Sequence, residues 1–374
     1  MRLRTVGAVL LMAAVRLPAQ STYDLTGTPD AAIKEPFTRV DGARELPGNR
    51  AIVTDQMERT VYLVDFSAGS RRQIGRQGDG PAEYRLPMAP FPGSGGTTWI
   101  LDATLRRLHV IAPDGSFRPS LTPPYDAVRG GLLAARGVDA RGRIYFEGNS
   151  FNSETGRFTD SVAVIGWDPS TNATETLGVV SSGGRVAIQR QGSRVSIARS
   201  VLPFPHVDAW TTLPDGRVAI VRQSPHTIAF LERGAAPQSS PVLPFTGIPV
   251  TPAERTAWRE RNSARMVATG GAESRRMEVE DELFPPDMPA FVSTAVMTDA
   301  TGRIWVGRSH RSSDRTWRYD LYDSKGAHVG VATLPVYSRI VGFGDGVAYV
   351  ARTDPADDLV YLEGHKLKPG QARR

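Results

Sequence analysis

The chain has 374 residues, of which 40% are hydrophobic and 22% charged, and its formal net charge is +6. Glycine (37 residues) and proline (28 residues) are more abundant than in an average globular chain, which indicates many turns and excludes a long helical bundle or coiled coil. Cysteine is absent and no basic run with interleaved aromatics occurs, so disulfides, thiolate metal sites and nucleic-acid binding are not expected.

The first segment of the chain, residues 1–19, has the pattern of a secretory signal peptide. Arg2 and Arg4 precede an apolar run from Val6 to Val15, and a cleavage site follows at Ala19. The alternative is a first β-strand or buried helix. The apolar run is too short to span a bilayer, and no other run is long or apolar enough. We therefore expect an exported protein, periplasmic or extracellular, with a mature chain covering 20–374.

An internal repeat extends through the rest of the chain. Each copy holds a turn with glycine, a short β-rich segment, a polar turn and a second β-rich segment. Asp-Gly and related pairs allow the positive φ of tight hairpin turns, and β-branched and aromatic residues favour strands. The six copies begin near Pro47, Gly96, Arg141, Asp215, Thr301 and Asp345.

The spacing of these copies predicts a six-bladed β-propeller. A four-stranded blade takes roughly 40–50 residues, so the two longest intervals must hold insertions, at 181–205 and about 247–290. A single sheet cannot bury both faces, whereas a ring of sheets buries each against its neighbours. The predicted fold class is therefore all-β, with a short helical insertion.

One column of the repeat carries large side chains. An aromatic residue there could stack a sugar, but packing between blades is the interpretation we favour. The column consists of Ile52, Trp99, Tyr145, Ala219, Trp305 and Tyr349.

Two segments carry a resemblance to known proteins. The segment from Trp99 to Gly115 is similar to an NHL-type propeller repeat. The segment from Ile74 to Tyr84 resembles the glycine-rich link between blades in secreted bacterial six-bladed β-propeller proteins. The resemblance covers the mature chain and implies the fold and export, without a settled chemistry. Three residues of the link are candidates for ligand binding: Arg76, Glu83 and Tyr84.

The two insertions have different patterns. Residues 181–205 alternate basic and apolar residues around a glycine, which predicts a hairpin. In the second insertion, Thr251, Pro252 and Glu254 form a capping box that opens a helix over 251–268. An acidic helix is expected to follow over 273–284.

The first of these helices is a candidate lid. We expect Trp258 and Met266 to face a blade or the mouth of the channel, and the alternative is an exposed, mobile flap.

The ring needs a strand to close its last blade. The segment 22–25 is expected to supply the outer strand of that blade, since the sixth repeat leaves little chain for it. The alternative is a strand formed by His365–Lys368.

Charged residues follow the aromatic column by three positions, where the second strand of each blade enters its turn. These positions are Asp55, Asp102, Gly148, Arg222, Arg308 and Arg352. Arginine on blades 4 to 6 predicts binding of an anionic small molecule, glycan or acidic peptide, because a guanidinium matches carboxylate and phosphate groups. The alternative is that Arg308 and Arg352 only pair with Asp314 and Asp354 in their own loops.

No residue is assigned to catalysis or to a metal, and no cofactor is expected. The six histidines form no zinc-binding spacing, and no Gly-x-Ser-x-Gly motif occurs. The leading expectation is a monomeric, non-catalytic scaffold that binds a ligand or protein over its axial channel, on the face of the b–c turns. The alternative is a metal-dependent lactonase- or lyase-like propeller enzyme, and a third is a structural partner in an envelope complex.

Overall fold

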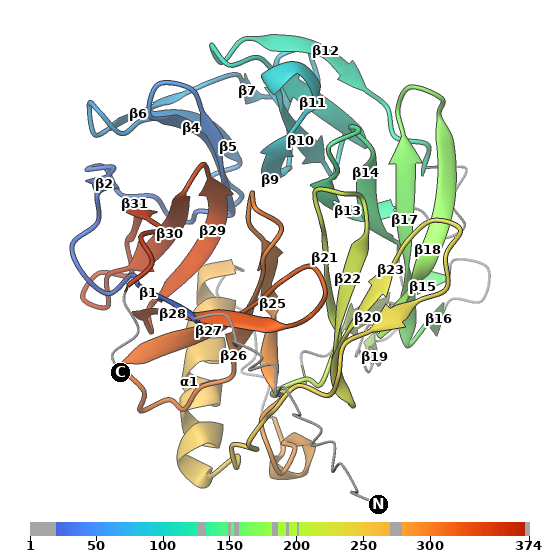
Figure 1. The fold of residues 1–374 in the computed structure, drawn as a ribbon, viewed down its shortest axis with the longest axis vertical. Helices are drawn as coiled ribbons and strands as arrows, with labels where there is room; N and C mark the ends of the chain where they lie inside the picture. The colour runs from blue at the N-terminus through green and yellow to red at the C-terminus, as the bar shows by residue number, and fades with distance from the viewer. Residues whose placement is uncertain are drawn as a thin grey trace, which may run out of the picture.

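In the computed structural model the strands form a ring of six blades around a central axis (Figure 1). The structure describes residues 20–125, 132–148, 151–152, 157–181, 186–191, 194–199, 202–269 and 279–370. The all-β, six-bladed fold expected from the repeat is confirmed. The segment 1–19 lies outside the described residues, so the signal peptide stays a prediction.

The strands of each blade are lettered a to d from the axis to the rim. Blade 1 consists of β3 (Gly42–Leu46), β4 (Arg50–Asp55), β5 (Thr60–Asp65) and β6 (Ser70–Gln73). Blade 2 consists of β9 (Pro87–Pro92), β10 (Thr98–Asp102), β11 (Arg107–Ile111) and β12 (Phe117–Leu121). Blade 3 consists of β13 (Leu132–Val138), β14 (Ile144–Gly148), β17 (Ser161–Asp168) and β18 (Ala173–Ser181).

The second half of the chain forms the other three blades. Blade 4 consists of β21 (Ala209–Thr212), β22 (Val218–Gln223), β23 (His226–Leu231) and β24 (Gln238–Ser239). Blade 5 consists of β25 (Phe291–Thr298), β26 (Ile304–Arg308), β27 (Thr316–Tyr322) and β28 (His328–Pro335). Blade 6 takes β29 (Ser338–Gly344), β30 (Val347–Thr353) and β31 (Val360–Lys366) from its own repeat.

Smaller elements lie in the links between these strands. They are β7 (Arg76–Gln77) paired with β8 (Glu83–Tyr84), β15 (Phe151–Asn152) paired with β16 (Arg157–Phe158), and the short 3₁₀ turns at Ser94–Gly96 and Asp281–Leu283.

The core is divided among the blade interfaces. Six clusters of buried apolar residues each join two successive blades, and the last joins blade 6 to blade 1. The large-residue column belongs to all six clusters, and each member packs toward the next blade around the ring. Ile52, Trp99, Tyr145, Ala219, Trp305 and Tyr349 are at most 4% exposed, which confirms packing over sugar stacking.

The N-terminal segment closes the ring, but not as the sequence suggested. Strand β1 (Ser21–Asp24) pairs parallel with β28, so it is a fifth strand on blade 5. The outer strand of blade 6 is instead β2 (Ala31–Ala32), which pairs antiparallel with β31. The expected placement of 22–25 on the last blade is wrong because Tyr23 and Leu25 bury their side chains in the cluster between blades 5 and 6. The alternative, a fourth strand from 365–368, is also wrong, since His365 and Lys366 end the third strand of blade 6, β31.

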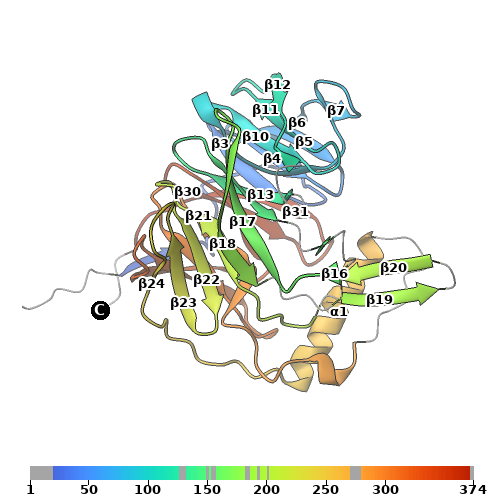
Figure 2. The same cartoon turned by 90° about the vertical axis from the view of Figure 1, so that its right-hand side faces the viewer.

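The hairpin expected in the first insertion and the first helix expected in the second are both present. Residues 181–205 contain the hairpin β19 (Val186–Gln191) and β20 (Arg194–Arg199), and the second insertion contains α1 (Pro252–Thr269). Figure 2 shows α1 and this hairpin together, outside the blades and at one end of the propeller. The second helix expected over 273–284 lies mostly outside the described residues, which show only the 3₁₀ turn. Among the described residues, no helix is long and apolar enough to cross a membrane.

Helix α1 is docked rather than free. Trp258 is partly buried and meets Phe284 edge to face, with 5.5 Å between ring centroids. Glu254 is buried and accepts hydrogen bonds from the backbone nitrogen and the hydroxyl of Ser312, in the b–c link of blade 5, at 3.0–3.1 Å. The side chain of Met266 lies outside the described residues.

Replacing Glu254 with alanine is expected to release the start of α1 from blade 5. The change leaves the Ser312 donors without their acceptor, and amide hydrogen exchange in residues 252–262 should accelerate by about tenfold or more. Glu260→Ala is the matched control, because Glu260 is exposed on the same helix. Equal exchange in the two variants would show that the ion–dipole contacts of Glu254 do not hold the helix.

Candidate functional site

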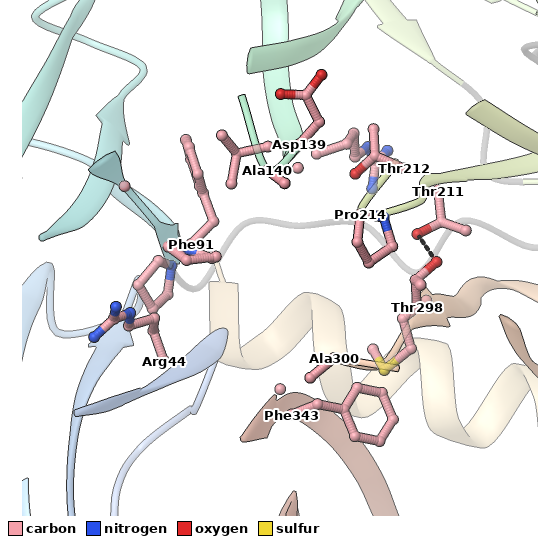
Figure 3. Close-up of a pocket in the computed structure, with 18 of the residues that line it drawn as sticks. Arg44, Phe91, Asp139, Ala140, Thr211, Thr212, Pro214, Thr298, Ala300 and Phe343 are labelled. Atoms are coloured by element: carbon pink, nitrogen blue, oxygen red, sulfur yellow. Dashed lines mark hydrogen bonds between the residues drawn. The ribbon is translucent and has the colours of Figure 1, made fainter. Parts of the chain in front are cut away.

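A hollow lies on the propeller axis. It has a volume of about 670 Å³ and is formed by the innermost strands and the a–b turns. Figure 3 shows the residues of several blades around it, among them Phe91, Thr212, Thr298 and Phe343. The cavity is therefore at the a–b end of the axis, whereas the sequence placed the ligand at the end of the b–c turns. Helix α1 lies at that other end, where Glu254 bonds to the b–c link of blade 5.

Threonine hydroxyls and backbone groups supply part of the polar surface of the wall. The Thr211 hydroxyl on β21 and the Thr298 hydroxyl on β25 hydrogen-bond across the seam of blades 4 and 5 at 2.9 Å (Figure 3). Thr212 follows on β21 and is buried. Glycine and proline at the a–b ends of β9 and β29 leave backbone groups close to the axis. A wall of this kind can donate hydrogen bonds to a polar small molecule and accept hydrogen bonds from it.

The two carboxylates in the wall are already engaged. Asp139 accepts from Arg143 Nε at 2.7 Å and from the Tyr145 hydroxyl at 3.0 Å, and Figure 3 shows its carboxylate turned away from the middle of the cavity. Asp299 repeats the pattern in blade 5, with Arg303 Nε at 2.7 Å and Trp305 Nε1 at 2.9 Å. Both also accept backbone amides of their own turn. These carboxylates therefore fix the a–b turns and the large-residue column.

Three arginines line the cavity, and one of them is already neutralised by a carboxylate. Arg136 on β13 pairs with Glu147 at 2.8 Å, and Arg141 is exposed at the rim. The side chain of Arg44, on β3, forms no hydrogen bond or ion pair with another described residue. Asp139 and Asp299 are neutralised by Arg143 and Arg303, so Arg44 and Arg141 are the charges of the described wall without an opposite charge beside them.

The two aspartates expected over the channel are buried in their own blades. Asp55 accepts from the backbone nitrogens of Arg39, Met57 and Glu58 at 2.8–3.0 Å. Burial raises the pKa of Asp55, and the nearby acids Glu58 and Asp41 act in the same direction.

Asp102, at the same position in blade 2, behaves in the opposite way. Burial opposes its ionisation, but His109, at 3.6 Å, and several backbone amides outweigh burial and lower the pKa of Asp102 to about 2. Each carboxylate accepts hydrogen bonds from two segments, the link that precedes its blade and the b–c turn of that blade. It thereby ties these two segments together. Gly148, the equivalent position in blade 3, ends β14.

The three arginines expected to converge each have a partner in their own blade. Arg222 turns inward to Asp208, beside strand a, at 2.6 Å. Arg308 turns outward to Asp320 on strand c, and Arg352 pairs with Glu363 on strand c at 2.6 Å. The loop acids Asp314 and Asp354, which the sequence offered as partners, are not the ones used. All three arginines lie near the b–c turns, but each side chain is held by an acid of its own blade, so the three do not converge on one site. Ligand binding by them stays a prediction.

The three candidates in the link before blade 2 also have internal partners. Arg76 and Glu83 form an ion pair at 2.6 Å, and Glu83 also accepts the backbone nitrogen of Gly80 at 2.8 Å. Tyr84 is fully buried, donates to the carbonyl of Ile74 at 3.0 Å and accepts from the nitrogen of Val61 at 3.2 Å. These contacts hold the link on blade 1, and ligand binding by Arg76, Glu83 and Tyr84 stays a prediction.

Sequence reasoning missed the residues that line the cavity. They lie on strand a, which comes before the conspicuous part of the repeat, and alternate there with core residues. The one available signal was charge on this strand, because Arg44 and Arg136 occupy the innermost strands of blades 1 and 3. The side chain of a basic residue on strand a can point only into the axial channel or into the interface between two blades.

No protein-family model and no curated protein matches the chain. Solved structures do resemble it over nearly its whole length. A calcium-binding protein, regucalcin, from Agrobacterium tumefaciens is 13% identical, with a TM-score of 0.45 and coverage of 94% of this chain and 97% of that one. A gluconolactonase from Xanthomonas campestris is 10% identical, with a TM-score of 0.44 and coverage of 93% and 98%. A virginiamycin B lyase from Staphylococcus aureus is 10% identical, with a TM-score of 0.42 and coverage of 90% and 98%.

These neighbours correct the leading expectation. Gluconolactonases and streptogramin-type lyases are enzymes by name, which agrees with the enzyme alternative, so the expectation of a non-catalytic scaffold is wrong. The likeness itself is one of fold.

Proposed function

We propose that this protein is an enzyme that acts on a small anionic molecule held in the axial cavity. The observation that carries the proposal is the cavity itself, about 670 Å³ in volume and lined by arginines whose nearby aspartates are already paired. Sites for small molecules occupy about 300–1,000 Å³ and combine an enclosing wall with a few polar groups. The axial cavity has both properties.

The chemistry of the wall narrows the substrate class. Arginine binds carboxylate or phosphate groups through two parallel N–H donors. The hydroxyls of Thr211, Thr212 and Thr298 can hydrogen-bond to an ester or lactone carbonyl. A small lactone or ester bearing a carboxylate therefore suits the wall, and hydrolysis or elimination at such a substrate is the reaction class that we propose.

The described residues of this wall do not form a set of metal ligands. In the ranges that the structure describes, no group of three histidine, aspartate or glutamate side chains is placed to hold a metal ion. His109 and His365 each lie beside a single carboxylate, at 3.6 and 3.1 Å, and both are buried in their blades. We derive no step through a metal.

Closing the mouth of the cavity tests the proposal. Ala140 and Ala300 are exposed at the rim, so tryptophan there should obstruct the entrance while leaving the core intact. The double variant should lose about tenfold or more of kcat/KM on a panel of carboxylated lactones and esters, because the substrate no longer reaches the wall. Ala356→Trp, at an exposed position in the b–c loop of blade 6, is the control.

Activity that survives in the double variant would place the reaction elsewhere. No turnover of the panel by the wild type, together with no binding of its members, would reject the enzyme proposal.

Export and the kinship to NHL-like repeat proteins belong to the same proposal. Export is supported by the basic start and apolar run of residues 1–19. Kinship is supported by the segment from Trp99 to Gly115, which forms strands b and c of blade 2. We also propose that the protein is a monomer.

A further inference from the structure

Arg44 occupies a junction in the wall of the axial cavity. It lines that cavity and also a second hollow of about 530 Å³, which lies between the a–b turn of blade 1 and residues Gly96 and Pro113 of blade 2. Figure 3 shows its guanidinium turned from β3 away from the middle of the axial cavity. The group therefore stands where the two hollows meet.

The guanidinium of Arg44 lacks the partners that a half-buried charge needs. Its Nη1 atom is closed off from solvent and has no hydrogen-bond acceptor. Burial lowers the pKa of Arg44, and the neighbouring Glu45 only partly opposes that effect. Among the described residues every other arginine in the cavity wall is either paired or exposed at the rim. Arg44 is thus a cation whose counter-charge is missing.

The acids around Arg44 are committed elsewhere. Glu45 accepts from the backbone nitrogen of Asp345 at 2.8 Å and from the Tyr349 hydroxyl at 3.0 Å, which fixes blade 1 to blade 6. Asp139 and Asp299 serve the arginines of their own turns. No carboxylate in the described wall is free to move onto Arg44, so a counter-charge would have to come with a ligand that enters the hollows lined by Arg44 and meets the part of its side chain that stays accessible there.

We propose that Arg44 is the residue that binds the negatively charged group of the ligand, a carboxylate or a phosphate, at the junction of the two hollows. The inference rests on the proposed function in one respect: it assigns the anion to the molecule held in the axial cavity. A guanidinium with a free, desolvated N–H is selective for a planar or tetrahedral oxyanion over a neutral group. Arg44 then sets specificity by binding, and it takes no part in bond making.

The test compares Arg44→Met with Arg118→Met. Both changes remove one positive charge, and Arg118 is exposed on the outer strand of blade 2, far from the axis. Thermal melts are recorded in a chloride buffer and then with increasing inorganic phosphate or acetate. Without added anion, Arg44→Met should melt at the wild-type temperature or about a degree higher, because the unpaired charge is gone. With phosphate or acetate, wild type and Arg118→Met should be stabilised, and the dissociation constant in Arg44→Met should rise by about tenfold or more.

Two results would overturn the inference. One is stabilisation of Arg44→Met by either anion to the wild-type extent. The other is a clear loss of melting temperature in Arg44→Met without anion, which would give Arg44 a structural role. If the Arg44 results hold while blocking Ala140 and Ala300 leaves turnover unchanged, the anion site stands and the placement of the reaction in the axial cavity fails.

Discussion

Replacing Tyr23 and Leu25 together with alanine is expected to destabilise the propeller by about 4 kcal/mol or more, since each large-to-small change in a core costs about 2–5 kcal/mol. Both side chains are 3% exposed, and they anchor β1 in the cluster that joins blades 5 and 6. The Tyr23 ring lies 5.9 Å from that of Trp305, and its hydroxyl bonds to Arg303. Loss of this anchor also frees the outer edge of β28.

Urea unfolding of wild type and variant measures the effect. Thr28→Ala is the control, because Thr28 lies in the same N-terminal segment and is exposed. A double variant as stable as the control would mean that β1 pairs with β28 on blade 5 but does not contribute to closing the ring. That outcome would leave the contacts of β2, Ile33 and Phe37 with β31 to close the ring at blade 6.

The fold could be predicted because its signals are local. Glycine turns and β-branched runs recur with the length of a blade, and the column from Ile52 to Tyr349 repeats at each interface. The capping box of Thr251 and Glu254 likewise marks the start of α1. The residues that close the ring could not be predicted, because 22–25 and 31–32 are both short segments that precede the first repeat. What decides between them is the shape of the seam that Tyr23 and Leu25 enter.

The candidate site could not be predicted from the sequence, because it too depends on contacts between distant segments of the chain. The sequence identifies which residue of each blade reaches the b–c turn, but not which way its side chain turns or what it meets. Arg222 and Arg308 occupy equivalent positions, yet one pairs toward the axis and the other toward the rim. Pairing with Asp208 or Asp320 depends on partners more than ten residues away along the chain. Arg44 is informative for the opposite reason, because the fold gives it no partner.

The second large effect is expected at Asp102. Its two oxygens accept four backbone N–H groups: those of Arg85 and Leu86 at 2.6 and 3.3 Å, and those of Thr104 and Leu105 at 3.0 and 2.8 Å. In Asp102→Asn one oxygen becomes an NH₂ group that faces N–H donors. Breaking a buried charged network of this kind costs about 3–5 kcal/mol. Asp114→Asn is the control in the same blade, because Asp114 serves an exposed turn.

The pH dependence of this loss has a definite sign. Asp102 titrates at a pKa of about 2 in the fold, against about 3.9 in an unfolded chain. Because the folded pKa is the lower one, ionised Asp102 contributes about 2–3 kcal/mol above pH ~4, and this contribution disappears as the pH falls from about 4 to about 2. The difference in unfolding free energy between wild type and Asp102→Asn should therefore shrink over that range in urea titrations.

For Asp55, whose pKa is raised by burial, ionisation weakens the fold, so the difference in unfolding free energy between wild type and Asp55→Asn should move in the opposite direction as the pH falls. Parallel pH profiles for the two variants would contradict the assignment of opposite roles to these equivalent aspartates.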